Sequence, residues 1–238
     1  MIRIGITGTD TGVGKTVVGT ALLALLRARG LRVSAFKPVE TGVERGDPSS
    51  DAEVLRQAAG GSDPQELVCP YALPQPIAPW LAAREAGVEI RPGVLDRALA
   101  ELSRERDVVL IEGAGGLLVP VAPDIRYDTL FNCWGADVII VARDRLGVIN
   151  HTLLTVEAAQ RAGLRVLGVV VNRGEECETD ARDVSRASNL TALTELLPEL
   201  PVIQFPIVPA PRDFQALADI AVRHGLGALV PGVSRPAD

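Results

Sequence analysis

The residues best suited to chemistry stand in the glycine-rich segment Gly8–Thr16, which reads GTDTGVGKT and directly follows the apolar run Ile2–Ile6. Small residues let backbone N–H groups surround a polyphosphate, and the N-terminus of a following helix adds its positive dipole end. Lys15 can reach the terminal phosphates, and the hydroxyl of Thr16 can bind Mg²⁺. Thr9 stands where the strict pattern has glycine, and a glycine turn that merely caps a helix is the alternative. The Gly-Lys-Thr ending favours a phosphate-binding loop.

Charged residues follow two further apolar runs that we expect to be buried strands. Lys37 comes directly after Phe36, and Glu112 comes directly after Ile111 and precedes a run of glycines. Ligands of parallel sheets collect at the carboxyl ends of the strands, so both side chains are expected near the phosphate-binding loop. An acidic residue at that place is typical of a carboxylate that reaches the Mg²⁺ of a bound nucleotide.

Three other polar positions are candidates for a binding site. Asp51 opens a predicted helix, where its carboxylate can either stabilise the helix dipole or bind Mg²⁺, and the spacing favours neither role. Asn172 ends another apolar run, and its amide offers both a donor and an acceptor to an adenine edge. The helix that starts at Gly147–His151 has free N–H groups that can hold a carboxylate or phosphate.

The pattern of apolar runs predicts an α/β fold, with a doubly wound and mostly parallel sheet flanked by helices. The predicted strands are Ile2–Ile6, Val33–Phe36, Val108–Ile111, Val138–Val141, Val166–Val171 and Val202–Phe205. The predicted helices are Thr16–Arg29, Ala52–Ala59, Val94–Arg104, Ile149–Ala162, Thr191–Leu196 and Phe214–His224. We expect a single domain over residues 1–230, followed by a C-terminal tail over residues 231–238. The proline-dense segment Pro70–Pro79 is interpreted as a loop, and Arg173–Ser188 as a surface insertion.

The composition excludes several classes of function. The net charge is −6 and no basic run stands out, which argues against binding to nucleic acid or to an anionic membrane surface. The three cysteines are widely spaced and show no metal-ligand pattern. No apolar run approaches membrane-spanning length, and the start of the chain lacks the layout of a signal peptide. We therefore expect a soluble, cytoplasmic protein.

Taken in order, these segments resemble the dethiobiotin synthetase family. The matching stretches are Thr7–Thr16, Lys37–Gly42, the helix start at Asp51, Glu112–Pro120, Gly147–His151 and Val171–Asn172. The combination is specific, whereas the phosphate-binding loop alone is shared with many nucleotide-binding proteins. The resemblance implies an ATP-dependent synthetase that forms the ureido ring of dethiobiotin from 7,8-diaminononanoate and CO₂. It implies a carbamate and a carbamic-phosphoric anhydride as intermediates, with release of ADP and phosphate.

The resemblance also implies roles for particular residues. Lys37, Lys15 and Thr11 would act on the carbamate and the phosphates, and Thr16, Asp51 and Glu112 would hold Mg²⁺. The nucleotide would be contacted by Gly12, Val13, Gly14, Lys15, Thr16, Val17, Asp51, Glu112, Gly113, Ala114, Gly115, Asn172, Arg173, Pro206, Ile207, Val208 and Asp213. The substrate would be contacted by Thr41, Gly147, Val148 and Asn150, the last three from the neighbouring subunit of a homodimer. Trp80 departs from the family, which often carries histidine there.

Three other classes of protein fit this sequence less well. A dimeric partitioning-type ATPase would carry an extra lysine early in the phosphate-binding loop, where this chain reads Thr9-Asp10-Thr11. An amide ligase of the cobyrinic-acid type would need a glutaminase domain, for which the chain has no room. A nucleotide-binding regulatory module would leave Lys37 and Thr41 unexplained. The synthetase therefore remains the favoured interpretation.

Overall fold

The computed structural model of the chain describes residues 1–174, 183–208 and 212–232. Within these residues a parallel sheet of six strands forms the centre of the molecule, in the order β10-β9-β8-β1-β5-β2. Its strands are β1 (Ile2–Gly8), β2 (Val33–Phe36), β5 (Val108–Gly116), β8 (Asp137–Arg143), β9 (Val166–Asn172) and β10 (Val202–Phe205). All six predicted strands are therefore present, and the predicted α/β class is confirmed.

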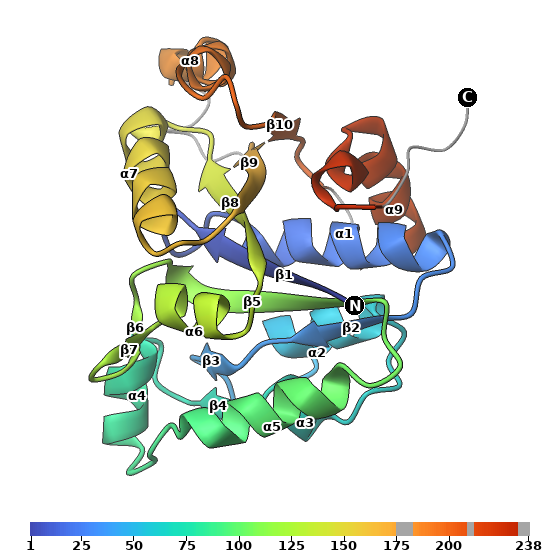
Figure 1. Ribbon diagram of the computed structural model, residues 1–238, viewed down its shortest axis with the longest axis vertical. Coiled ribbons are helices and arrows are strands. Elements are labelled where there is room, and N and C mark those ends of the chain that lie inside the picture. Colours follow the sequence, from blue (N-terminus) through green and yellow to red (C-terminus); the bar gives the residue numbers. More distant parts are fainter. Residues whose placement is uncertain (175–182, 209–211, 233–238) are drawn as a thin grey trace.

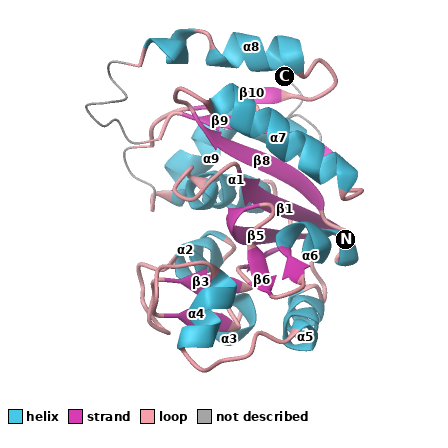
Figure 2. Cartoon of the chain, turned by 90° about the vertical axis from the view of Figure 1, so that its left-hand side faces the viewer, coloured by secondary structure: helices cyan, strands magenta, loops and turns pink. Residues whose placement is uncertain are grey.

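Helices cover both faces of this sheet, which explains why its strands are continuous apolar runs (Figures 1 and 2). Helices α1 (Lys15–Ala28) and α9 (Phe214–Arg223) lie on one face and pack against each other. Helices α6 (Tyr127–Cys133) and α7 (Val148–Arg161) lie on the other face. The sheet between them forms one buried core built mainly of Val, Ile, Leu and Ala.

The remaining elements lie around the edges of the sheet. They are β3 (Val39–Thr41), α2 (Asp51–Ala58), α3 (Gln65–Val68), β4 (Tyr71–Leu73), α4 (Pro79–Glu85), α5 (Pro92–Leu102), β6 (Pro120–Ala122), β7 (Ile125–Arg126), α8 (Asn189–Leu196) and the 3₁₀ turns η2 (Val184–Ala187) and η3 (Leu226–Leu229). Strands β3 and β4 pair with each other, as do β6 and β7, outside the central sheet. None of the helices in the described ranges is both long and apolar enough to cross a membrane.

The proline-dense segment Pro70–Pro79 is not wholly a loop, as the sequence had suggested. It contains β4, whose residues Tyr71 and Leu73 pair in parallel with Val39 and Thr41 of β3. Proline lacks an N–H and breaks a ladder, but the prolines flank this strand and leave its own N–H groups free to pair. The sequence interpretation failed because three paired residues between prolines are too few to show a strand pattern.

The ends of two other predicted segments can be compared with the structure in part. Val230, the last residue of the predicted domain, is buried, and residues 231 and 232 are described while 233–238 lie outside the described residues. In the predicted surface insertion, residues 175–182 lie outside the described residues, and Val184–Ala187 form η2. The single-domain boundary and the tail stay predictions.

The order of the strands determines where a ligand can bind. The chain leaves β1 toward β2 on one side, returns to β5, and then crosses to β8 on the other side of β1. The carboxyl end of β1 is therefore a point where connections diverge, and clefts form at such points. Gly8, the last residue of β1, lies in register with Gly116 of β5 and Val141 of β8. The glycine-rich loop starts from this position.

We predict that Gly5→Ala in β1 lowers the free energy of unfolding by about 1–3 kcal/mol, the usual cost of overpacking a core. An added Cβ would lie 2.9 Å from Cδ1 of Phe131 and 3.0 Å from Cγ1 of Val138. Urea unfolding followed by circular dichroism measures the change. Gly93→Ala in α5 is the matched control, because an added Cβ there meets nothing within 4 Å in the described structure. Equal stability of the two variants would contradict the close packing at Gly5.

Candidate active site

The carboxyl ends of the central strands surround a polar cavity of about 350 Å³. Most of its lining comes from the glycine-rich loop, the start of α1, the residues that follow β2, and the end of β5. The lining residues are Thr11, Gly12, Gly14, Lys15, Thr16, Val17, Lys37, Glu40, Thr41, Asp51, Ala114 and Gly115. The structure therefore brings together most of the residues that the sequence predicted for phosphate and metal binding.

The glycine-rich loop has the backbone geometry of an anion site. Thr9 N–H donates to the carbonyl of Val141 at 3.0 Å, which ties the loop to β8. Gly14 is the N-cap of α1 with φ 94°, and no side chain of the described residues caps that helix. The first N–H groups of a helix lack partners within the helix, and they bind anions where no side chain caps them. The loop is therefore suited to hold phosphates.

Asn172 supports this loop from the end of β9. Its Nδ2 donates to the carbonyl of Val13 at 2.9 Å, and its Oδ1 accepts from Gly174 N at 3.3 Å. The side chain is buried, and any Cβ on Gly14 would collide with its amide. Asn172 thus helps to explain why position 14 is glycine, in addition to the positive φ. A contact between Asn172 and adenine stays a prediction.

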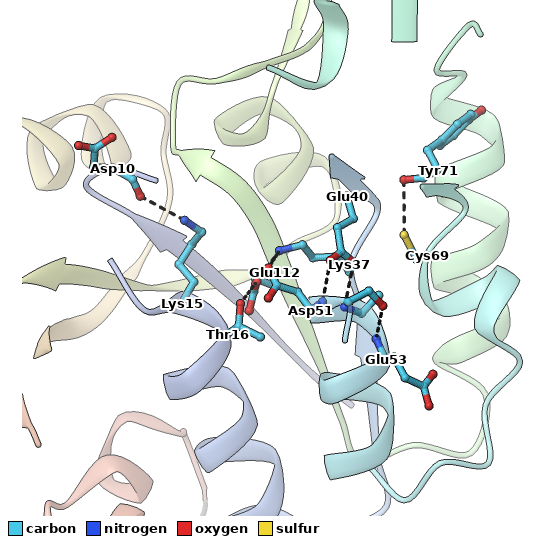
Figure 3. A network of polar contacts seen from close by, with 12 residues as sticks. Asp10, Lys15, Thr16, Lys37, Glu40, Asp51, Glu53, Cys69, Tyr71 and Glu112 are labelled. Carbon is cyan, nitrogen blue, oxygen red and sulfur yellow. Dashed lines mark hydrogen bonds and ion pairs between the residues drawn. The ribbon is translucent and has the colours of Figure 1, made fainter. Parts of the chain in front are cut away.

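Lys37 and Asp51, which line the cavity, form a group of charges with the buried Glu112 (Figure 3). Lys37 Nζ is 2.5 Å from Glu112 Oε1 and 3.1 Å from Asp51 Oδ2. The hydroxyl of Thr16 donates to the same Glu112 oxygen at 2.9 Å. Lys37 is 3% exposed and Glu112 is 0% exposed, so these are desolvated charges. The ammonium group therefore joins carboxylates from β5 and α2, two segments far apart in the sequence.

Burial and charge act in opposite directions on the two lysines of this site. Burial alone would lower the pKa of Lys37, but the charges of Glu112 and Asp51 outweigh it and raise the pKa above its usual value. Lys15 has no such close partner, and its Nζ donates only to the carbonyl of Asp10, at 3.2 Å, among the bonds the described residues show. Burial therefore lowers the pKa of Lys15 to about 8. An anionic ligand would restore its charge.

Lys15 and Lys37 are the two lysines of the whole chain, and every other basic side chain except histidine is arginine. Both lie in this cavity. Lysine provides a compact point charge on a flexible stem, which suits contact with a phosphoryl oxygen that changes position during a reaction. The scarcity of lysine is therefore a feature of the sequence that points to this site.

Thr16, Asp51 and Glu112 fit a magnesium ion by their donor chemistry. They supply a hydroxyl and two carboxylates, and Mg²⁺ prefers hard oxygen ligands with one or two protein carboxylates beside nucleotide phosphates. Among the described residues, Glu112 Oε2 is buried without a hydrogen-bond partner. The described part of the chain holds no group of three or more His, Cys, Asp or Glu side chains that could hold a metal ion.

A second cavity of about 430 Å³ adjoins the first and is mostly apolar. It is lined by Gly8, Thr9, Asp10, Thr11, Gly116, Leu117, Leu118, Val119, Pro120, Leu154, Thr155 and Ala158. Thr11 lines both cavities. Leu118 is 50% exposed and Leu154 is 58% exposed, so two large apolar side chains face solvent here in the single chain. The site therefore combines a polar half and an apolar half that share one wall.

Several predicted residues lie outside both cavities. Gly113 faces away, because a Cβ there would meet Tyr127 of α6. Asp213 caps α9 by accepting from Ala216 N at 3.0 Å. Val13, Glu112 and Asn172 are buried and line neither cavity. The other residues outside the cavities stand at the end of β9, after β10 and at the start of α7: Arg173, Pro206, Ile207, Val208, Gly147, Val148 and Asn150. Their contacts with a nucleotide or substrate stay predictions.

The sequence analysis missed two polar contributions to the site. Glu40 lines the polar cavity and accepts hydrogen bonds from the start of α2. Asp10 forms a 3.2 Å ion pair with Arg145, so the glycine-rich loop is linked to the segment before α7. Both pairings join segments that no local sequence pattern connects.

Comparison with known proteins agrees with this geometry. Residues 3–206 match a family model described as an AAA domain. An ATP-dependent dethiobiotin synthetase BioD of Nitrosospira multiformis is 41% identical over 91% of this chain and 94% of its own length. Another, from Anaeromyxobacter sp. (strain Fw109-5), is 46% identical over 74% of this chain and 77% of its own length. The chain belongs to the dethiobiotin synthetase family. The family resemblance inferred from the sequence is thereby confirmed.

The structural comparison supports the fold of this dethiobiotin synthetase family member. The septum site-determining protein MinD of Pyrococcus horikoshii, solved with Mg-ADP, has a TM-score of 0.54 and 17% identity over 97% of this chain and 99% of that chain. MinD of Pyrococcus furiosus has a TM-score of 0.52 and 20% identity over 94% of this chain and 91% of that chain. At such identities the likeness concerns the fold alone.

We predict that Lys15 titrates near pH 8 in the protein without nucleotide, because burial lowers its pKa to about 8. Below this pH the ammonium form dominates, and above it the neutral amine dominates. Bound ADP, an anion, should raise the midpoint. Labelling with [¹³C]lysine gives Cε signals from only two residues, and a Lys37→Arg variant assigns them. A Lys15 midpoint above pH 10 without nucleotide would contradict the prediction.

Proposed function

We propose that this chain catalyses the ATP-dependent formation of dethiobiotin from 7,8-diaminononanoate and CO₂. The observation that carries the proposal is the placement of both lysines of the chain at one polar cavity, next to an apolar cavity that shares Thr11. The curated relatives that match most of the chain carry the name ATP-dependent dethiobiotin synthetase. Polar and apolar halves fit a triphosphate and a long-chain aliphatic diamine.

The reaction requires two anions to meet. One amine of the substrate attacks CO₂ and loses a proton, which gives a carbamate. A carbamate oxygen then takes the γ-phosphoryl group of ATP, and ADP leaves. The second amine attacks the carbamoyl carbon, phosphate leaves with release of a proton, and the ring closes. Because carbamate and triphosphate repel each other, catalysis depends on positive charge and positioned N–H donors.

Each group of this chain has a distinct proposed part. The backbone N–H groups at residues 12–16 would hold the phosphates, and Lys15 would neutralise their terminal oxygens. Lys37, kept charged by Glu112 and Asp51, would neutralise the carbamate and the phosphoryl group in transfer. Thr41 lines the same cavity and would contact the reacting end of the diamine.

Thr16, Asp51 and Glu112 would hold Mg²⁺ together with the nucleotide. When bound, the ion neutralises charge on the phosphate oxygens and orients them. Thr16 and Asp51 line the polar cavity, and the buried Glu112 accepts a hydrogen bond from the Thr16 hydroxyl. We propose a cytoplasmic enzyme as well, since its reaction consumes ATP.

We further propose that the enzyme acts as a homodimer whose interface covers the apolar cavity. Leu118 and Leu154 line that cavity and are half-exposed in the single chain. Exposed apolar side chains grouped at a cavity are typical of an interaction surface. The start of α7, at Gly147–Asn150, would then supply N–H groups to the substrate carboxylate of the neighbouring subunit.

We predict that phosphate release from Mg-ATP and bicarbonate depends on 7,8-diaminononanoate and equals the dethiobiotin formed. Lys37→Ala should lower kcat by about 10²- to 10³-fold, the usual cost of losing one charge that stabilises the transition state, with a smaller change in nucleotide affinity. Phosphate is measured by a coupled assay and dethiobiotin by mass spectrometry.

Arg104→Ala serves as the control for the loss of a positive charge, because Arg104 lies just after α5 and its side chain is 74% exposed. It should retain wild-type turnover. ATP hydrolysis that is indifferent to the diamine would contradict the synthetase and favour a switch ATPase. Full turnover by Lys37→Ala would contradict only the role proposed for Lys37.

We predict that Leu154→Glu converts the dimer to a monomer and abolishes dethiobiotin formation, since it places a charge in the proposed apolar interface. Light scattering coupled to size-exclusion chromatography measures the mass. Val222→Glu on α9 is the matched control, because Val222 is 45% exposed and lies on the opposite face of the sheet. A dimer that survives Leu154→Glu with full activity would place any interface elsewhere.

A further inference from the structure

Glu40 makes an unusual pair of contacts for a buried carboxylate. It lies in β3, is 5% exposed, and points toward the start of α2 (Figure 3). Its Oε1 accepts from Asp51 N at 2.6 Å, and its Oε2 accepts from Ala52 N at 2.9 Å. Both oxygens of one side chain are thus used on the first two N–H groups of a helix that is distant from it in the sequence.

These contacts complete the N-terminus of α2. The first N–H groups of a helix have no partner within the helix and need one when buried. Ser50, the N-cap, accepts from Glu53 N at 3.2 Å and leaves the first two N–H groups to Glu40. A carboxylate bonded to backbone N–H groups at a helix N-terminus forms strong, charge-assisted hydrogen bonds. Glu40 therefore determines how the first turn of α2 is oriented.

The first residue of that turn is Asp51, whose carboxylate belongs to the charge group of Lys37, Glu112 and Asp51. Asp51 Oδ2 lies 3.1 Å from Lys37 Nζ. The segment Lys37–Glu40 contacts Asp51 twice. Lys37 pairs with the Asp51 carboxylate, and Glu40 accepts a hydrogen bond from the Asp51 N–H. The connection over residues 42–50 contains two glycines with positive φ and no helix or strand. Such a loop does not by itself determine where α2 begins.

We propose that Glu40 is a positioning residue, which holds the first turn of α2 so that the Asp51 carboxylate meets Lys37 and the Thr16–Glu112 pair. Glu40 acts through Asp51 and need not touch the nucleotide. The proposal rests on the proposed function, since it assigns Asp51 to the magnesium–nucleotide site. Partners of this kind, one step removed from a metal, typically change metal affinity by about 10–100-fold when they are mutated.

An ordinary structural cap is the alternative, and the chain offers a control for it. Ser50→Ala removes the other cap of α2 while it leaves both bonds to Glu40 in place. If Glu40 only stabilises the helix, Glu40→Gln and Ser50→Ala should have similar effects in every measurement. If Glu40 positions Asp51, the two variants should lower the unfolding midpoint by similar amounts but differ in their affinity for the metal ion.

The experiment compares wild type, Glu40→Gln and Ser50→Ala by Mn²⁺ binding in the presence of ADP, detected by electron paramagnetic resonance. We expect a 10- to 100-fold loss of Mn²⁺ affinity in Glu40→Gln and less than about a twofold change in Ser50→Ala. A second readout is the [¹³C]lysine spectrum without nucleotide, in which the Lys37 Cε signal should move in Glu40→Asp, which keeps the charge that acts on Lys37, but not in Ser50→Ala.

Unchanged Mn²⁺ affinity in folded Glu40→Gln and an unchanged Lys37 signal in Glu40→Asp would overturn the proposal, as would equal losses in Ser50→Ala. Glu40→Asp, which keeps the charge but shortens the side chain, also replaces Glu40→Gln in the Mn²⁺ measurement if that variant does not fold, with the same expected losses. Neither readout involves the diamine. A wild type that makes no dethiobiotin would therefore refute the proposed function, while these readouts would still test the position of Asp51.

Discussion

The buried ion pairs of Lys37 are the interaction on which the rest of the site depends. An unpaired charge inside a protein is very costly, so a lysine that is 3% exposed requires carboxylates at contact distance. Glu112 and Asp51 meet this requirement from β5 and from α2. Three segments are thus held together by electrostatics at the edge of a sheet whose own hydrogen bonds join only β2 and β5 among them. The helix α2 is the segment that needs additional anchoring.

The balance of charge in this group would oppose a bound triphosphate unless a cation accompanied it. Glu40, Asp51 and Glu112 bring three carboxylates to the site, whereas Lys15 and Lys37 bring two ammonium groups. Burial lowers the pKa of Lys15 to about 8, so even its charge is incomplete in mildly alkaline solution without a ligand. A bound nucleotide would add negative charge to a cluster in which carboxylates already outnumber ammonium groups. Neutralisation by a divalent ion bound to Asp51 and Glu112 would resolve this conflict.

The sequence was informative wherever function and fold share a local pattern. The segment Gly8–Thr16, the residue after β2 and the six strands are contiguous patterns, and the structure contains these elements, with β5 continuing through Glu112 to Gly116 instead of ending at Ile111. Glu40 could not be predicted in the same way, because its partners are backbone N–H groups on the far side of a loop. The strand β4 was missed for a similar reason, since its three residues can be recognised as a strand only by their pairing with β3. Tertiary partners, rather than propensity, define both features.

Thr11 lies where the polar and apolar cavities meet, so one loop borders both. The polar side is lined by Thr11–Val17 of the glycine-rich loop and the start of α1, apart from Val13, together with residues after β2 and at the end of β5. The apolar side is lined by Gly8–Thr11 of the same loop, by residues 116–120 and by α7. The Asp10–Arg145 ion pair joins the two sides, because it links the loop to the segment that leads into α7. Residues 116–120 and α7 line the apolar cavity alone, so substitutions there can change that cavity while the lining of the polar cavity stays the same.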